Sequence, residues 1–181
     1  MQSSIEEKRE SICQRLKQRE CRETLFQEDY DLLRTWAADS NSEIRTLIVG
    51  FLAQRTEQSA GKLLLTLSRD PDPAVRAYAL DVLCNFPGEK CSERLRQAAE
   101  TEPDAAARFC AIRSLADGMA ETEPSAALAF FQALFRRATE ELCRLGCCYG
   151  TSPFGDHRAL PHLLRPLSAK PPDTRAHSPQ H

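Results

Sequence analysis

The chain of 181 residues lacks several features that would assign it to a common functional class. No apolar run approaches the ~20 residues that are needed to span a bilayer. The first 18 residues contain no apolar stretch of the kind found in secretory signals. A net charge of -2 gives no basic excess, which a nucleic-acid-binding protein needs. We therefore expect a cytoplasmic protein that binds neither membranes nor nucleic acid.

The eight cysteines form no CxxC pair. Secreted disulfide frameworks are usually short and loop-rich, whereas this chain carries a long helical pattern. We expect reduced thiols, with Cys84 and Cys110 as small apolar residues on helix faces. Cys143 and Cys147 share one helical face beside Cys148, but a structural zinc usually has four ligands and no further ones are evident. The sequence therefore predicts no metal and no cofactor.

What the chain does contain is a helical pattern with a fixed period. Apolar residues recur at intervals of three and four over the first 150 positions, without the alternation that is typical of strands. Arg45, Arg76 and Arg108 follow one another at separations of 31 and 32 residues. The neighbours of these arginines recur with them: an acid six residues earlier (Asp39, Asp70, Glu102) and a leucine seven residues later (Leu52, Leu83, Leu115). Such a period indicates an array of repeats that lean on one another.

Each period is predicted to be a pair of antiparallel helices joined by a turn. The clearest turn is at residues 69–73, between two apolar stripes with helical spacing. Pro71 and Pro73 cannot lie in a helix interior, whereas Asp72 can cap the helix that follows. Weaker copies of this plan surround turns at 39–42 and 101–104.

The two ends of the array differ from its middle. Residues 1–21 are expected to form a capping helix, because a terminal repeat needs a polar outer face. A fourth pair of helices begins at Ser125, and the best alignment places Cys143 where the arginine should be. The predicted solenoid domain spans residues 1–150.

Residues 151–181 have a different composition. They hold six of the eleven prolines and all four histidines. We expect this tail to be disordered. An alternative is that the tail is not the natural continuation of the chain, because a repeat array should proceed into another apolar helix and a shift of reading frame produces such a break.

The segment SRDPDPAVRAYALDVL, residues 68–83, resembles a HEAT repeat, in particular the short bacterial type associated with phycobilisome lyases. The resemblance implies an all-α fold: a right-handed α-solenoid of about four antiparallel helix pairs whose second helices line a concave face. It also implies that each recurring arginine bonds the acid six residues earlier and the carbonyls of the turn, tying one unit to the next. The residues expected in this structural ladder are Arg45, Arg76, Arg108, Asp39, Asp70, Asp72 and Asp104.

The register of the arginines also predicts the concave face. Positions one, five and eight after each arginine should point away from the core. In the second and third units these positions are Ala77, Asp81, Cys84, Phe109, Arg113 and Ala116. Small side chains let a partner approach closely, and aromatic and arginine side chains commonly anchor interfaces. The alternative is a plain inner face on which Phe109 packs against its neighbours.

The known chemistries of HEAT-like enzymes find little support in these residues. Deoxyhypusine hydroxylase binds iron through His-Glu pairs on its repeats, whereas every histidine here lies in the tail. No catalytic constellation is evident. We therefore expect a non-enzymatic interaction or scaffold module with an unknown protein partner. The alternative is a phycobilisome-lyase-type accessory protein, or another HEAT-like enzyme subunit, and a lyase would bind an open-chain tetrapyrrole.

Overall fold

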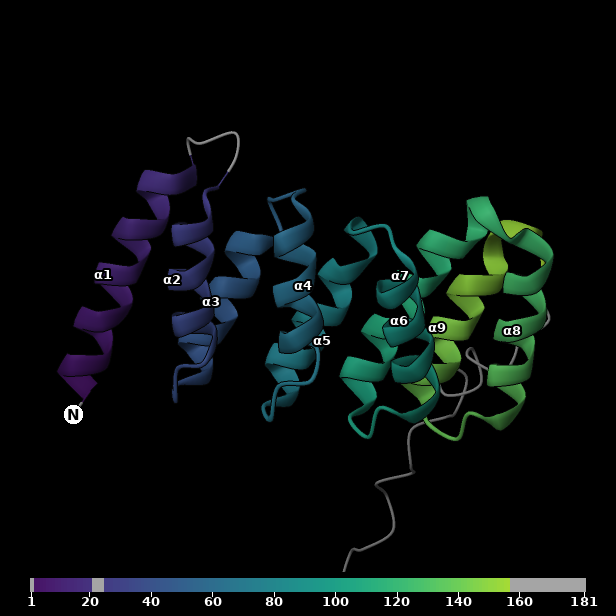
Figure 1. The fold of residues 1–181 in the computed structure, drawn as a ribbon. Helices are drawn as coiled ribbons and strands as arrows, with labels where there is room; N and C mark the ends of the chain where they lie inside the picture. Colours follow the sequence, from purple (N-terminus) through teal and green to yellow (C-terminus); the bar gives the residue numbers. More distant parts are fainter. Residues whose placement is uncertain (1, 21–24, 157–181) are drawn as a thin grey trace, which may run out of the picture.

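The computed structural model describes residues 2–20 and 25–156, without the side chains of residues 2–5, 8, 19, 20, 120 and 121 (Figure 1). Within this part the chain forms nine α-helices, two short 3₁₀ helices and no strand. None of these helices is long and apolar enough to cross a membrane. The elements are α1 (Gln2–Glu20), α2 (Gln27–Ala37), α3 (Ser42–Leu52), α4 (Gln58–Leu67), α5 (Pro73–Val82), η1 (Leu83–Asn85), α6 (Glu89–Thr101), α7 (Ala105–Thr122), α8 (Pro124–Arg137), α9 (Glu141–Thr151) and η2 (Ser152–Phe154).

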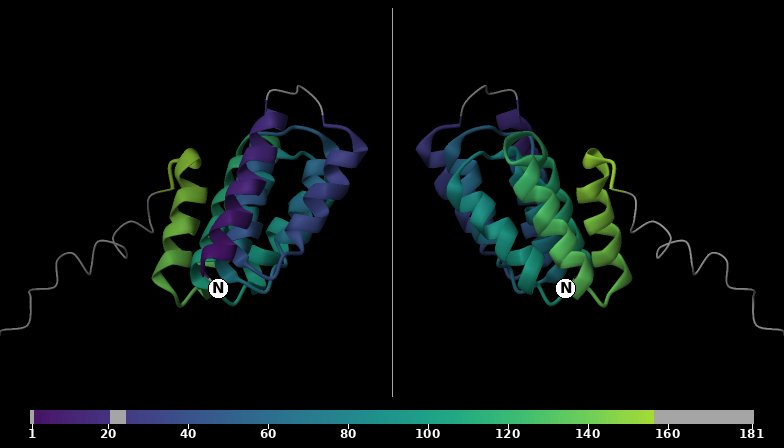
Figure 2. Two further views of the ribbon diagram at one scale, coloured as in Figure 1. Left: turned by 90° about the vertical axis from the view of Figure 1, so that its left-hand side faces the viewer. Right: turned by 90° about the vertical axis from the view of Figure 1, so that its right-hand side faces the viewer.

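After α1, the helices form four antiparallel pairs that stack side by side: α2–α3, α4–α5, α6–α7 and α8–α9 (Figure 1). Views along the stack show the helices in two rows (Figure 2). The second helices α3, α5, α7 and α9 pack closely one after another, whereas the contacts between the first helices α2, α4 and α6 are much sparser. The more tightly packed row lies on the inside of the curve. This arrangement confirms the predicted all-α solenoid of helix pairs.

The second helices begin where the turn residues can cap them. The side chain of Asn41 accepts a hydrogen bond from the backbone N–H of Glu43, at the start of α3. Asp72 accepts from two backbone N–H groups at the start of α5, where Pro73 occupies the first turn. Asp104 caps α7 in the same way. Each cap satisfies backbone donors that have no partner inside the helix, so the short polar side chain fixes where the helix starts.

One continuous apolar core runs between the two rows of helices. Its largest fully buried side chains come from every pair, among them Leu33, Ile48, Leu64, Leu83, Ile112 and Phe131. At the N-terminal end, α1 packs against α3 and buries Ile12 and Leu16. Burial of such side chains is the main driving force for stacking, because a single helix pair cannot bury its apolar face alone.

The fourth pair corrects the predicted register. Glu140 is the residue that precedes α9, and the residue four positions later is Arg144, as in the three earlier second helices. Cys143 is only 1% exposed and occupies the core position held by Ile44 and Val75 in earlier units. The prediction that Cys143 replaces the arginine is therefore wrong. The turn at 138–140 is as short as the one before α7, but Glu140 stands in place of the usual short cap residue, so an alignment that takes Thr139 as the cap slips by one residue.

The ordered chain also extends beyond the predicted boundary at residue 150. Helix α9 continues to Thr151, and Phe154 in η2 packs against the core. The Asp156 carboxylate accepts a hydrogen bond of 2.6 Å from the side chain of Gln132 in α8. Residues 151–156 thus fold back onto the last helix pair, and the remainder of the predicted tail, 157–181, lies outside the described residues.

Candidate functional site

The recurring arginines link each helix pair to the next one. Nε and Nη2 of Arg45 donate hydrogen bonds to the two carboxylate oxygens of Asp70, both at 2.7 Å. Nη1 of the same side chain donates to the backbone carbonyls of Asp39 and Ser40 in its own turn. We expected the arginine to bond the acid six residues earlier. In the structure it bonds that residue's carbonyl, and the carboxylate comes from the equivalent acid of the following unit.

The second unit repeats this link, although Nε and Nη2 of Arg76 both donate to the same carboxylate oxygen, Oε1 of Glu102. Arg76 donates to the carboxylate of Glu102 in the following turn, at 3.0 and 2.7 Å, and to the carbonyl of Asp70. The acids have a second task, since Asp70 also accepts the backbone N–H of Asp72 two residues further on. Each acid therefore shapes its own turn and receives the arginine of the preceding unit. Because charge-assisted bidentate bonds are the strong and directional ones, this ladder fixes how adjacent units sit against each other.

The third link uses a different acid. Position 138, which corresponds to the acids of the earlier turns, is an alanine, and Arg108 instead bonds the carboxylate of Glu140 at 3.0 Å. The side chains of this pair are 20% and 40% exposed, compared with 9% and 5% for Arg45 and Asp70. Water screens the third link more strongly, so it contributes less to stability than the first. The hydrogen bond with Asp70 raises the pKa of Arg45, even though burial opposes the charge.

Only part of the predicted concave face is available for contact. Ala116 is 4% exposed and belongs to the core, so its assignment to a binding surface is wrong. Ala77 and Cys84 are half-buried. Phe109 is half-buried as well, beneath α9, where a Cβ placed on Gly146 would lie 3.2 Å from the Phe109 ring. Phe109 therefore packs against its neighbouring helix, as the alternative reading of the sequence held, and exposes only an edge.

Asp81 and Arg113 lie opposite each other on the inner side of α5 and α7. Nη2 of Arg113 donates to a carboxylate oxygen of Asp81, and this bond raises the pKa of Arg113. The hydroxyl of Ser114 donates to the backbone carbonyl of Asp81 at 3.0 Å. The two charges neutralise each other across the gap between the helices. They form a closed pair at the middle of the inner face rather than a charged site that awaits a ligand.

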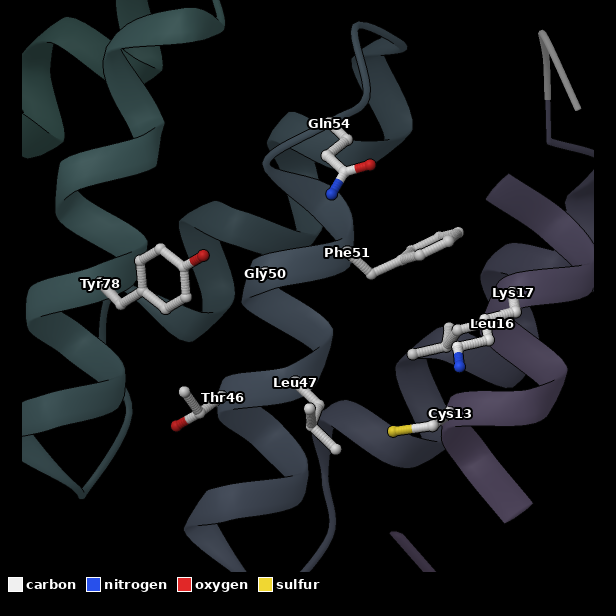
Figure 3. Close-up of a pocket in the computed structure, with 9 residues that line it drawn as sticks. All are labelled: Cys13, Leu16, Lys17, Thr46, Leu47, Gly50, Phe51, Gln54 and Tyr78. Carbon is white, nitrogen blue, oxygen red and sulfur yellow. The ribbon is translucent and has the colours of Figure 1, made fainter. Parts of the chain in front are cut away.

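The clearest hollow on the inner face lies at its N-terminal end, between α1, α3 and α5. This inner groove has a volume of about 410 Å³ and contains side chains from all three helices (Figure 3). Tyr78 of α5 lies beside Gly50 of α3, and the Tyr78 Oη would be only 3.3 Å from a Cβ on that glycine (Figure 3). The residues that line the groove are Cys13, Leu16, Lys17, Thr46, Leu47, Gly50, Phe51, Gln54 and Tyr78.

Sequence reasoning found only part of this groove. Thr46 and Gly50 occupy the positions one and five residues after Arg45, so the register of the arginine identifies them as inner-face residues. Tyr78 stands two residues after Arg76, a position that the pattern did not single out, and it is 38% exposed. Lys17 comes from α1, whose placement against α3 no local pattern reveals. The signal in the sequence that could have indicated the groove is Tyr78, a large aromatic residue on a helix face that otherwise carries small side chains.

The cysteines of α9 are held as thiols. Burial raises the pKa of Cys143 to about 11 and that of Cys147 to about 12. A thiol must lose its proton to bind a metal or to act as a nucleophile. In the described part of the chain, no three or more His, Cys, Asp or Glu side chains come together in a way that could hold a metal ion.

Comparison with known proteins adds one decisive observation to this geometry. Residues 61–149, from α4 to α9, match the family model for HEAT repeats. These residues belong to the HEAT-repeat family. No curated protein and no solved structure matches the chain. HEAT repeats commonly mediate protein–protein interaction or scaffolding.

Proposed function

We propose that this HEAT-repeat chain is a non-enzymatic interaction module that binds a protein partner along its inner face. The observation that carries the proposal is the inner groove between α1, α3 and α5, about 410 Å³ in volume. Its walls are apolar at Leu16, Leu47 and Phe51, and its mouth holds the exposed ring of Tyr78. Tyrosine, here with an exposed ring beside apolar surface, is a residue type that commonly anchors protein interfaces.

The groove favours an apolar anchor with an acidic neighbour. Leu47 is half-buried and offers contact area for an apolar side chain of a partner, and the exposed Lys17 offers a positive charge. Gly50 has no side chain and so leaves room on α3 for the side chain of Tyr78, which lies over it. Tyrosine is among the residue types that most often carry binding energy at interfaces. We infer that Tyr78 is the main anchor on this side.

The middle of the inner face contributes less than the sequence suggested. The Asp81–Arg113 pair is already satisfied, so a partner would gain little by contacting either charge. Changing Phe109, which the pattern marks as an anchor, would disturb the packing of α7 against α9. A test of recognition therefore has to use Tyr78, whose ring stands outside the core.

The test is affinity capture with the full chain, followed by mass spectrometry, for wild type and two matched variants. Tyr78→Ser removes the exposed aromatic ring of the groove, and Phe26→Ser removes an exposed aromatic ring from the start of α2, on the other row of helices. We expect a protein that wild type and Phe26→Ser both capture and that Tyr78→Ser loses. Capture of the same proteins by all three chains would contradict the proposal.

A second measurement separates this function from the lyase alternative. A phycobilisome-lyase-type protein would bind an open-chain tetrapyrrole, and the bound pigment would show a shifted absorption band. We expect no such shift when the pigment is titrated with the full chain. A saturable shift of the absorption band would contradict the interaction module and favour a phycobilisome-lyase-type protein.

A further inference from the structure

Arg144 in α9 stands at the position of a ladder arginine. Its backbone N–H donates to the carbonyl of Glu140 at 3.1 Å, as that of Arg45 does to Asn41 at 3.3 Å and that of Arg108 does to Asp104 at 2.9 Å. These are the first backbone bonds of the respective helices. Counted from the start of its helix, Arg144 is therefore the fourth member of the series of Arg45, Arg76 and Arg108, although it lies 36 residues after the third.

Unlike the other three, Arg144 bonds no acid among the residues that the structure describes. Its Nε atom is one of only two buried side-chain polar atoms in the described part of the chain that lack a hydrogen-bond partner. The guanidinium lies 5.0 Å from the centre of the Phe135 ring, and among the described residues it makes no ion pair. Buried donors without a partner are uncommon in folded proteins, and each one calls for an explanation. Each earlier ladder arginine has as its partner a carboxylate from the turn of the next unit.

Apolar side chains near Arg144 on α9 are also exposed. Of the five large apolar side chains that are exposed in the described chain, three lie on α9: Leu142, Leu145 and Tyr149. Leu145 follows Arg144 as Phe109 follows Arg108, and Phe109 is covered by the next second helix at Gly146. Leu145 is 44% exposed because no described helix lies beyond α9. An open ladder position and an exposed apolar helix face thus coincide at one end of the stack.

We propose that this end of α8–α9 docks a helical hairpin of another protein, whose turn supplies a carboxylate to Arg144. The hairpin would extend the stack by one unit, covering Leu145 with its second helix and placing an aspartate or glutamate where Asp70 stands relative to Arg45. This end face consists of Leu142, Arg144, Leu145 and Tyr149. It is separate from the inner groove, which lies between α1, α3 and α5 at the other end of the molecule.

A second copy of the chain does not fit this face. Two copies meeting through their C-terminal ends would bring together two Arg144 side chains and no acid. Two copies stacked head to tail would need an open N-terminal end, but α1 already covers that end and buries Ile12 and Leu16 against the core. The positive charge and the apolar surface are complementary to an acidic turn between two amphipathic helices, and the described part of this chain presents no such turn at an open end of its stack.

The probe for this proposal is a peptide with the sequence of the chain's own second hairpin, residues 57–86, which carries Asp70 in its turn. With a fluorescent label, its binding to the full chain is measured by anisotropy. We expect saturable binding to wild type that weakens at least tenfold for Arg144→Ala. The same loss is expected when the peptide carries Asp70→Asn, and combining the two changes should weaken binding no further, because both remove one bond.

Three controls separate a specific bond from a general effect. Arg137→Ala removes an arginine of α8 that pairs with Glu100 of the preceding unit, so it should bind the peptide as wild type does. The exchange of Arg144→Asp in the chain with Asp70→Arg in the peptide should restore binding. Tyr78→Ser should leave binding unchanged, which keeps this result independent of the inner groove. Absence of binding to wild type, or equal binding by Arg144→Ala in a folded chain, would overturn the proposal.

Discussion

Glu57 ties the start of α2 to the loop between α3 and α4. One of its carboxylate oxygens accepts the backbone N–H of Leu25 at 3.1 Å and an Nη2–H of Arg55 at 2.7 Å, and the other accepts the backbone N–H of Thr56. Burial by itself raises the pKa of this carboxyl, but the bonds from Arg55 and from the backbone prevail and lower it from 4.5 to about 2. The folded chain therefore prefers the ionised form more strongly than the unfolded chain does.

This preference predicts a pH-dependent effect of Glu57→Gln. Because the folded-state pKa is depressed, the stability that the carboxylate contributes is complete above about pH 5 and is lost as the pH falls toward 2. The difference in the free energy of unfolding between wild type and Glu57→Gln should shrink over this range by at most about 3 kcal/mol, less what solvent screening removes. Denaturant titrations at several pH values measure it.

The matched control is Glu28→Gln, which changes an exposed glutamate in the first turn of α2. We expect it to alter stability less than Glu57→Gln does at neutral pH. A difference for Glu57→Gln that stays constant from pH 6 to pH 2 would show that the carboxylate is not preferentially ionised in the folded chain.

Two glycines of α9, Gly146 and Gly150, allow this helix to pack closely against its neighbours. Gly150 faces the ring of Phe131, which is fully buried, and a Cβ on this glycine would lie 2.7 Å from two ring atoms. Gly146 faces Ile112 in the same manner, with its Cβ position 3.0 Å from the side chain. The glycines bring α9 against both α7 and α8 at distances that no larger residue allows.

Gly150→Ala should therefore destabilise the chain. The added methyl group forces Phe131 or the helix to move in a tightly packed core, at a cost of about 2 kcal/mol. Gly118→Ala is the control, since nothing lies within 4 Å of its Cβ position and it is an exposed residue of α7. Alanine favours helix by about 1 kcal/mol there, so the melting temperature should rise slightly. Equal effects of the two substitutions in thermal unfolding would contradict the packing described for α9.

The helices themselves follow closely from the sequence, because their signals are local. Asp72 and Pro73 fix the start of α5, and Asn41 fixes that of α3, through bonds between residues two or three apart. The register of α9 could not be found in this way, because Glu140 stands where the earlier second helices have a short cap residue and makes no side-chain cap bond. Counting from core residues, with Cys143 in the place of Ile44, recovers it.

Contacts between units were harder to predict than the units. The acid that binds Arg45 lies 25 residues away, and the one that binds Arg108 lies 32 residues away. The repeat pattern shows that an arginine and an acid recur once in each unit. It does not show whether an arginine binds the acid of its own unit or the acid of the following unit, because both recur at the same period. The inner groove depends on α1 packing beside α3, a contact that no periodicity encodes. Only the three-dimensional stack decides between these possibilities.

In the whole molecule, each unit is stabilised by its neighbours through a shared apolar core and a ladder of ion pairs. Apolar contacts between the second helices hold the row together, and the ladder sets the position of each pair against its neighbour. The ladder weakens toward the C-terminus, from the buried Arg45–Asp70 pair to the more exposed Arg108–Glu140 pair, and its last described arginine, Arg144, makes no ion pair with a described residue.

The most direct test of this account is a double-mutant cycle on Arg45 and Asp70. The free energies of unfolding are measured for wild type, Arg45→Ala, Asp70→Ala and the double variant. Breaking a buried pair leaves one charge without a partner, so each single change should cost about 3 kcal/mol. The double variant should be little worse than either, with a coupling of about 2 kcal/mol between the two sites. Additive effects would mean that the arginine of one unit does not depend on the acid of the next, and the ladder would be wrong.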